Sequence, residues 1–175
     1  LEVRGVNAMP YRDTRGPGSE ALAVMFRQLK KRNDAKGLRD VAIFRLLHDL
    51  ALRRNEIVTL DLEHLDRKQR KIAVLRKRNS ERKWITLPDI TVRALDSWVR
   101  ARGNSQGPLF VNLHASCRTR IGATAIYKLV RTLGDAAGVK TRPHGIRHTA
   151  ITEALDATHG DLRAVAQFSG HKNLA

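Results

Sequence analysis

One stretch near the carboxyl end of the chain carries residue types and spacings suited to holding an anion. Arg147 lies four residues before Ile151 and seven before Ala154, so a helix would place its guanidinium on the apolar face. An unpaired buried charge is costly, so Arg147 needs an anionic partner. His144 precedes it by three residues and falls on the same side of that helix. Because a guanidinium is a planar, permanently charged fork, phosphate is the anion that fits it best.

Two other interpretations of this stretch are open at the level of sequence. Arg147 could form an ordinary structural ion pair with a distant carboxylate. His144 and His148 are four residues apart, a spacing that can bind zinc on one helical face. Zinc would also need a third ligand, and usually a glutamate beside the first histidine, where this chain has Gly145. We therefore expect an anion site without a metal.

A second arginine falls in a similar pattern earlier in the chain. If residues 53–60 are helical, Arg53, Ile57 and Leu60 share one face. Glu56 lies one turn after Arg53 and could hold the guanidinium in place. The alternative is a plain intrahelical Arg53–Glu56 pair, which contributes little to stability.

Between these two stretches the periodicity changes to that of strands. Residues 71–75 and 83–87 predict a hairpin with a polar turn at 78–81. The hairpin is densely basic, which suits either a solvated rim or a surface laid against a nucleic-acid backbone. Its cations are Arg76, Lys77, Arg78, Arg82 and Lys83.

Composition points to the same kind of partner. The 175 residues contain 33 Lys and Arg against 17 Asp and Glu, a formal net charge of +16. An excess of that size predicts a polyanionic partner, nucleic acid before a membrane surface. Cys117 is the single cysteine, which excludes internal disulfides and suits a reducing compartment. We find no membrane-spanning run and no secretory signal, and the chain does not begin with Met, so we expect a piece of a longer protein.

The elements that must position these residues form one domain. We expect an arm over 1–18, a helix capped by Ser19, and a central helix over 38–52 after a break at Gly37. Helices should also follow Pro88, precede Gly138, include 144–155, and end at Ser169 after a cap at Asp161, with a third strand over 108–111. The predicted fold class is α+β, mainly α-helical, with a small antiparallel three-stranded sheet.

Taken in order, these motifs give the chain a family resemblance. Residues 52–57 (LRRNEI), 85–88 (ITLP), 144–148 (HGIRH) and 169–172 (SGHK) carry it. With them in this order, residues 19–175 resemble the catalytic domain of the tyrosine recombinases, the phage-integrase family of site-specific DNA recombinases. Ala51 stands where that family usually has glycine.

The resemblance implies a role for each matching residue. Arg53 and Arg147 would bind the non-bridging oxygens of the scissile phosphate and stabilise the transition state. Lys77 would protonate the leaving 5′-oxygen, His144 would assist proton transfer, and His171 would hydrogen-bond the phosphate. A tyrosine nucleophile would form a 3′-phosphotyrosine link. No metal ion or other cofactor is implied.

The lysine assignment has alternatives. The family's usual hairpin length, counted back from Thr86, ends on Arg78, which is not a lysine. A turn one residue longer selects Lys77, and Lys83 stays open as a second candidate. The expected partner is double-stranded DNA, bound as a homotetramer in the cytoplasm by further cations: Arg76, Arg78, Arg82, Lys83, Arg118, Arg120, Lys128, Arg131 and Arg142.

The chain also departs from the family pattern. The expected tyrosine is absent, because the chain ends four residues after His171. Tyr11 and Tyr127 lie in the wrong positions, and the usual amino-terminal DNA-clamping domain is missing. We therefore expect most of a catalytic domain, inactive by itself. A type IB topoisomerase, or a non-catalytic DNA-binding regulator on the same fold, is the alternative function.

Overall fold

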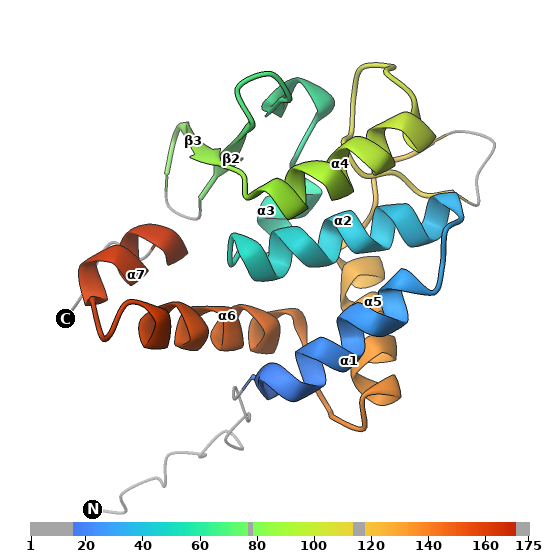
Figure 1. The fold of residues 1–175 in the computed structure, drawn as a ribbon. Helices are drawn as coiled ribbons and strands as arrows, with labels where there is room; N and C mark the ends of the chain where they lie inside the picture. The colour runs from blue at the N-terminus through green and yellow to red at the C-terminus, as the bar shows by residue number, and fades with distance from the viewer. Residues whose placement is uncertain (1–15, 77–78, 114–117, 171–175) are drawn as a thin grey trace, which may run out of the picture.

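A computed structural model describes residues 16–76, 79–113 and 118–170 (Figure 1). Its helices are α1 (Gly18–Lys30), α2 (Ala35–Asp49), α3 (Arg54–Val58), the 3-10 turn η1 (Leu62–His64), α4 (Asp89–Arg102), α5 (Ala123–Ala136), α6 (Pro143–Ala157) and α7 (Leu162–Ser169). Its strands are β1 (Leu65–Asp66), β2 (Lys71–Leu75) and β3 (Arg82–Thr86). The predicted fold class is confirmed.

Helix α2 is the centre of the domain. Asp34 starts it by accepting a hydrogen bond from the Gly37 backbone N–H at 2.9 Å. The helix packs against α1, α3, α4, α5 and α6, and Figure 1 shows it crossing the molecule between α4 and the α1–α6 layer. Such a helix must bury residues on several sides, and its buried residues include both apolar side chains and the ion pair of Arg39 and Asp40.

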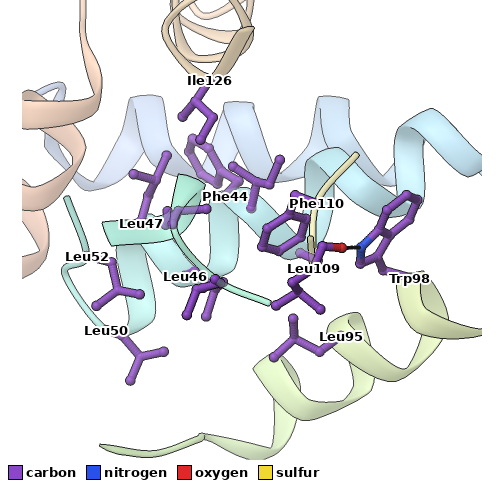
Figure 2. Packing of buried hydrophobic residues seen from close by; sticks show 14 of the residues in the cluster. Phe44, Leu46, Leu47, Leu50, Leu52, Leu95, Trp98, Leu109, Phe110 and Ile126 are labelled. Carbon is purple, nitrogen blue, oxygen red and sulfur yellow. Dashed lines mark hydrogen bonds between the residues drawn. The ribbon is translucent and has the colours of Figure 1, made fainter. Parts of the chain in front are cut away.

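The hydrophobic core surrounds α2 (Figure 2). Phe44, Leu46 and Leu47 are fully buried on it. Trp98 of α4 is also fully buried, and its indole N–H donates to the Leu109 carbonyl at 2.8 Å. This bond satisfies the one polar atom of the side chain and ties α4 to the segment after it. Among the described helices, none is long and apolar enough to cross a membrane.

The sheet has the order β1-β2-β3 and is antiparallel throughout. Ile72 and Val74 of β2 turn into the core, as the alternation predicts. The predicted third strand over 108–111 is wrong, because that segment makes only isolated bridges from Pro108 and Val111. Strand β1 takes its place. It is two residues long, too short to leave a periodic pattern.

Two predicted helix starts are also wrong. Helix α1 begins at Gly18 after Pro17, so Ser19 lies in the first turn, and its hydroxyl donates to Glu153 at 2.9 Å. Gly37 lies inside α2, which begins three residues earlier than predicted and ends at Asp49. A Cβ on Gly37 would stand 2.5 Å from the Arg32 carbonyl oxygen. This glycine therefore permits close packing and does not break the helix.

A polar cluster joins four helices at one end of α2. His48 contacts Asp49 through Nδ1 at 2.7 Å and Glu153 of α6 through Nε2 at 3.0 Å. Thr91 of α4 donates to Asp49 at 2.6 Å, and Ser19 of α1 donates to Glu153. Burial would lower the pKa of His48, but hydrogen bonds and charge attraction from Asp49 and Glu153 outweigh it and raise the pKa. Through its Nε2 contact with Glu153, the ring holds α6 against α2.

The raised pKa of His48 predicts a pH-dependent share of the free energy of unfolding. A histidine whose pKa is higher in the folded state stabilises fully below its unfolded value, near 6.5, and loses that effect as pH rises through the folded value. His48→Gln should cost about 2 kcal/mol at low pH, with the difference shrinking above pH 6.5. Denaturant unfolding of both proteins across pH measures this. A difference that stays constant with pH would contradict it.

Candidate active site

A cleft of about 840 Å³ opens where α3, α5, α6 and the end of β2 meet. Arg53, from the first arginine motif, and His144 and Arg147, from the second, all line it. The remaining lining residues come from the same elements and their flanks: Arg54, Asn55, Glu56, Thr59, Leu75, Arg76, Asn79, Tyr127, Arg142 and Pro143.

Arg147 lies at the floor of this cleft. It is only 2% exposed, as its position on the apolar face of α6 predicts. Its partners include two backbone carbonyls: Nη1 donates to Ala51, and Nη2 donates to Ser169 at 2.8 Å. The sequence pattern predicted that an anion would offset the buried charge of Arg147. Main-chain oxygens offset part of that charge. These bonds fix the plane of the guanidinium and join α6 to the ends of α2 and α7.

The first of these carbonyls comes from an unusual backbone conformation. Ala51 has a φ of +46°, in the left-handed region that L side chains seldom adopt. This turn follows α2 and directs the Ala51 carbonyl at the arginine. A glycine would adopt it without strain, so Ala51 bears a backbone cost that glycine at this position would avoid.

Arg53 is placed differently from the prediction. The helix predicted over 53–60 is the shorter α3, which begins at Arg54. Arg53 therefore precedes the helix and does not share a helical face with Ile57. Its side chain is 32% exposed on the cleft wall. Glu56 accepts from the Arg53 backbone N–H at 2.9 Å and from Nη1 at 3.0 Å. Because Glu56 is itself 4% exposed, this pair orients Arg53 and differs from a loose surface pair.

His144 lies in the first turn of α6 and faces the same cleft. Arg142 precedes the helix as its N-cap, and Pro143 occupies the first helical position, where its missing N–H costs nothing. Burial lowers the pKa of His144, and the charge of Arg147 lowers it further. The imidazole is therefore neutral at neutral pH and able to accept a proton.

The cleft concentrates positive charge. Burial, followed by repulsion from Arg53, lowers the pKa of Arg147 to about 10. Five arginines line the cleft against one carboxylate, Glu56, among the described residues. Protonated guanidinium groups held this close favour an anion between them, because it would relieve their mutual repulsion.

Three predicted site residues lie outside the described residues: Lys77, Arg78 and His171. Cys117 and Tyr11 do so as well. The residues that flank these positions are informative. Arg76 and Asn79 both line the cleft. The Ser169 carbonyl accepts a hydrogen bond from Arg147. Ser169 and Gly170 are the last described residues before position 171.

The predicted DNA-binding cations separate into two groups. Lys83, Lys128 and Arg142 are exposed, and Arg131 makes a loose pair with Asp135 at 3.8 Å. The other described candidates donate to main-chain carbonyls, so they brace the fold as well as carrying charge: Arg76, Arg82, Arg118 and Arg120. Arg76 departs furthest from the expectation, because it is only 7% exposed.

Sequence reasoning missed several lining residues. Arg54, Asn55 and Asn79 reach the cleft, although only the doubled arginine at 53–54 gave any signal. Tyr127 of α5 also lines it. The zinc interpretation gains no support. Among the described residues, the one trio of suitable ligands is Asp61, Glu63 and His64, away from His144 and His148.

The pKa of His144 should respond to an anion in the cleft. Without one it lies below 6.5, because burial and Arg147 disfavour the imidazolium. A sulfate between the arginines would favour the charged form, so the pKa should rise. NMR titration of the histidine ring in sulfate, against chloride of equal ionic strength, measures this. Equal pKa values in both salts would show that His144 does not face the anion.

Comparison with known proteins agrees with this geometry. The model of the phage integrase family matches residues 20–175. A tyrosine recombinase of Synechocystis sp. is 38% identical over 99% of this chain and 56% of its own length. One from Synechococcus elongatus is 37% identical, with the same two coverages. The chain thus spans about half the length of these curated relatives.

Solved structures share the fold. XerA recombinase superposes with a TM-score of 0.75 at 25% identity, covering 91% of this chain and 57% of its own. The integrase of transposon Tn1549, solved in complex with circular intermediate DNA, gives a TM-score of 0.69 at 17% identity, covering 95% of this chain and 60% of its own. The fold, the two arginine motifs on one cleft and the match over residues 20–175 show that the chain belongs to the phage integrase family, as a tyrosine recombinase catalytic domain.

Proposed function

We propose that this chain is the catalytic part of a longer site-specific recombinase that cuts and rejoins duplex DNA through a 3′-phosphotyrosine intermediate. The observation that carries the proposal is the cleft in which buried Arg147, Arg53 and neutral His144 face one space. The Tn1549 integrase, which shares this fold, is in complex with DNA, and this supports DNA as the partner here. A cytoplasmic homotetramer on DNA is the assembly we propose.

The residues divide the chemistry between them. Arg53 and Arg147 bind the non-bridging oxygens of the scissile phosphate, and their fixed positions favour the charge that develops in the transition state. Because each guanidinium is already oriented, by Glu56 or by two carbonyls, little reorganisation accompanies the reaction. His144 accepts the proton of the attacking hydroxyl and returns it during rejoining. His171 adds a hydrogen bond to the phosphate.

The nucleophile in this proposal is a tyrosine outside the 175 residues. Tyr127 lines the cleft but lies on α5, ahead of the His144–Arg147 motif, and so does not match the family position. Without a hydroxyl in line with the phosphorus, the cleft binds and polarises a phosphodiester but forms no covalent link. The chain by itself is therefore inactive.

Trapping of the covalent intermediate tests this function. The full-length protein is incubated with nicked duplexes tiled across the whole genome that carries its gene, and adducts are resolved on a denaturing gel. It should form an adduct, and the 175-residue chain should not. Arg53→Ala should slow adduct formation on the order of 10²-fold or more. Arg53 is the better target than Arg147, because it is partly exposed and its loss spares the core. Arg100→Ala, on the exposed part of α4, is the matched control.

Each contrary outcome has a definite meaning. An adduct formed by the chain alone and abolished by Tyr127→Phe would move the nucleophile to the cleft wall. Failure of the full-length protein to form any adduct with the tiled duplexes would reject recombinase activity. Normal adduct formation by Arg53→Ala would return Arg53 to a structural role.

A sulfur-containing substrate tests the proposed general acid. Leu75, Arg76 and Asn79 of the cleft bracket position 77, whereas Lys83 is described and does not line it, which supports Lys77. A 5′-bridging sulfur leaves without protonation, so it should restore cleavage by Lys77→Ala to within about tenfold of the wild-type rate. Lys83→Ala should show no such rescue. Rescue of Lys83→Ala alone would transfer the role to Lys83.

A further inference from the structure

Arg76 directly follows β2 and precedes position 77, and it is buried. It is 7% exposed, although it belongs to a densely basic hairpin. Its Nη1 donates to the Glu56 carboxylate at 3.3 Å and to the Ser169 carbonyl at 3.3 Å. Its Nη2 donates to the Phe168 carbonyl at 3.2 Å. One side chain therefore connects the hairpin to α3 and to the end of α7.

The partners of Arg76 are also partners of the two cleft arginines. The Glu56 carboxylate accepts hydrogen bonds from the backbone N–H and from the guanidinium of Arg53. Ser169 accepts from Arg147 at 2.8 Å. Arg76 thus shares one acceptor with each of them. A displacement of Arg76 would alter the hydrogen bonding of both Arg53 and Arg147.

Gly170 packs directly on Arg76 at the end of α7. Its φ is +68°, which favours glycine. A Cβ at this position would stand 3.0 Å from Nε and 3.1 Å from Cζ of Arg76. The guanidinium therefore occupies the space that a side chain at position 170 would need, and the fit is close from both sides.

We infer that Arg76 is a positioning residue that sets the hairpin and the α7 end relative to the phosphate-binding arginines, and that it is not a contact to the DNA backbone. The inference rests on the proposed function. In the sequence, position 77 follows Arg76 directly, and position 171 follows Gly170, which packs on Arg76. The Arg76 side chain therefore contacts or adjoins the residues next to both of the remaining proposed catalytic groups.

Arginine is required for this role because of its shape. Its planar fork donates in several fixed directions at once, as three acceptors on two elements demand. Lysine keeps the charge but is a point donor on a flexible stem, so it cannot reproduce this geometry. Arg76→Lys therefore separates positioning from simple charge.

Single-turnover cleavage by the full-length protein, on the nicked duplex that forms an adduct, provides the first test. With saturating DNA, Arg76→Lys and Arg76→Met should both cleave about 10²-fold more slowly than the wild type, as expected when reacting groups are misplaced. The salt dependence of binding to duplex DNA should not change. A phosphate contact would behave in the opposite way: Arg76→Lys would be near normal, and Arg76→Met would reduce the slope of log affinity against log salt by about 0.9. Arg100→Met controls for the loss of an exposed charge.

Amide hydrogen exchange provides a readout that does not depend on cleavage. Arg76→Lys should raise exchange over α7 and leave α2 and α4 protected. Gly170→Ala should give the same pattern, because its methyl group crowds the guanidinium and its backbone is strained at a φ of +68°. The double variant should be no worse than either single variant, since both break one network. Additive effects, or wild-type protection of α7 in Arg76→Lys, would overturn the inference.

The two proposals fail in different ways. If the wild-type protein forms no adduct, recombinase activity is rejected, and exchange over α7 still decides whether Arg76 couples the hairpin to that helix. If the wild-type protein cleaves and Arg76→Lys cleaves equally well, the positioning role alone is rejected. If Arg76→Met does not fold, the milder Arg76→Lys and Gly170→Ala variants carry the decision.

Discussion

A guanidinium buried beneath an otherwise cationic cleft is the constraint on which the rest of the structure depends. Arg147 is 2% exposed, and its charge must be offset by acceptors placed with care. Those acceptors include the carbonyls of Ala51 and Ser169, which come from the ends of α2 and α7. Three elements must therefore meet at one point before the arginine can be buried, and the left-handed turn at Ala51 follows from that requirement.

Glu56 balances the same region from the opposite side. It is the one carboxylate among the described residues that line the cleft, and it is nearly fully buried. Both Arg53 and Arg76 donate to it, so one negative charge orients two positive ones. In the proposed function, an incoming phosphodiester would neutralise the remaining excess of positive charge. The cleft is organised in advance, and preorganised charge is the most effective way to stabilise a phosphoryl-transfer transition state.

Local sequence patterns correctly predicted the features of a helix that depend on residues close together in the chain. The burial of Arg147 and the face that it shares with His144 both follow from helical spacing and are confirmed. The predictions were wrong where contacts between distant segments determine the local structure. Gly37 is a glycine because Arg32 packs against it, and residues 108–111 find no strand to pair with. The two-residue strand β1 has no periodicity from which to infer it.

The sequence by itself determined the fold class, the cationic character and the two arginine motifs, because charge and periodicity are local properties of the chain. Glu56 as the partner of Arg53 was also predicted from their spacing. Tertiary structure alone decided the partners of Arg147 and Arg76. Arg147 and Arg76 bond to main-chain carbonyls, and every residue has a carbonyl, so no residue type marks such a partner. For the same reason Arg76, one cation among several in a basic hairpin, shows its buried position only when β2, α3 and α7 are brought together. Packing, rather than composition, distinguishes it from its neighbours.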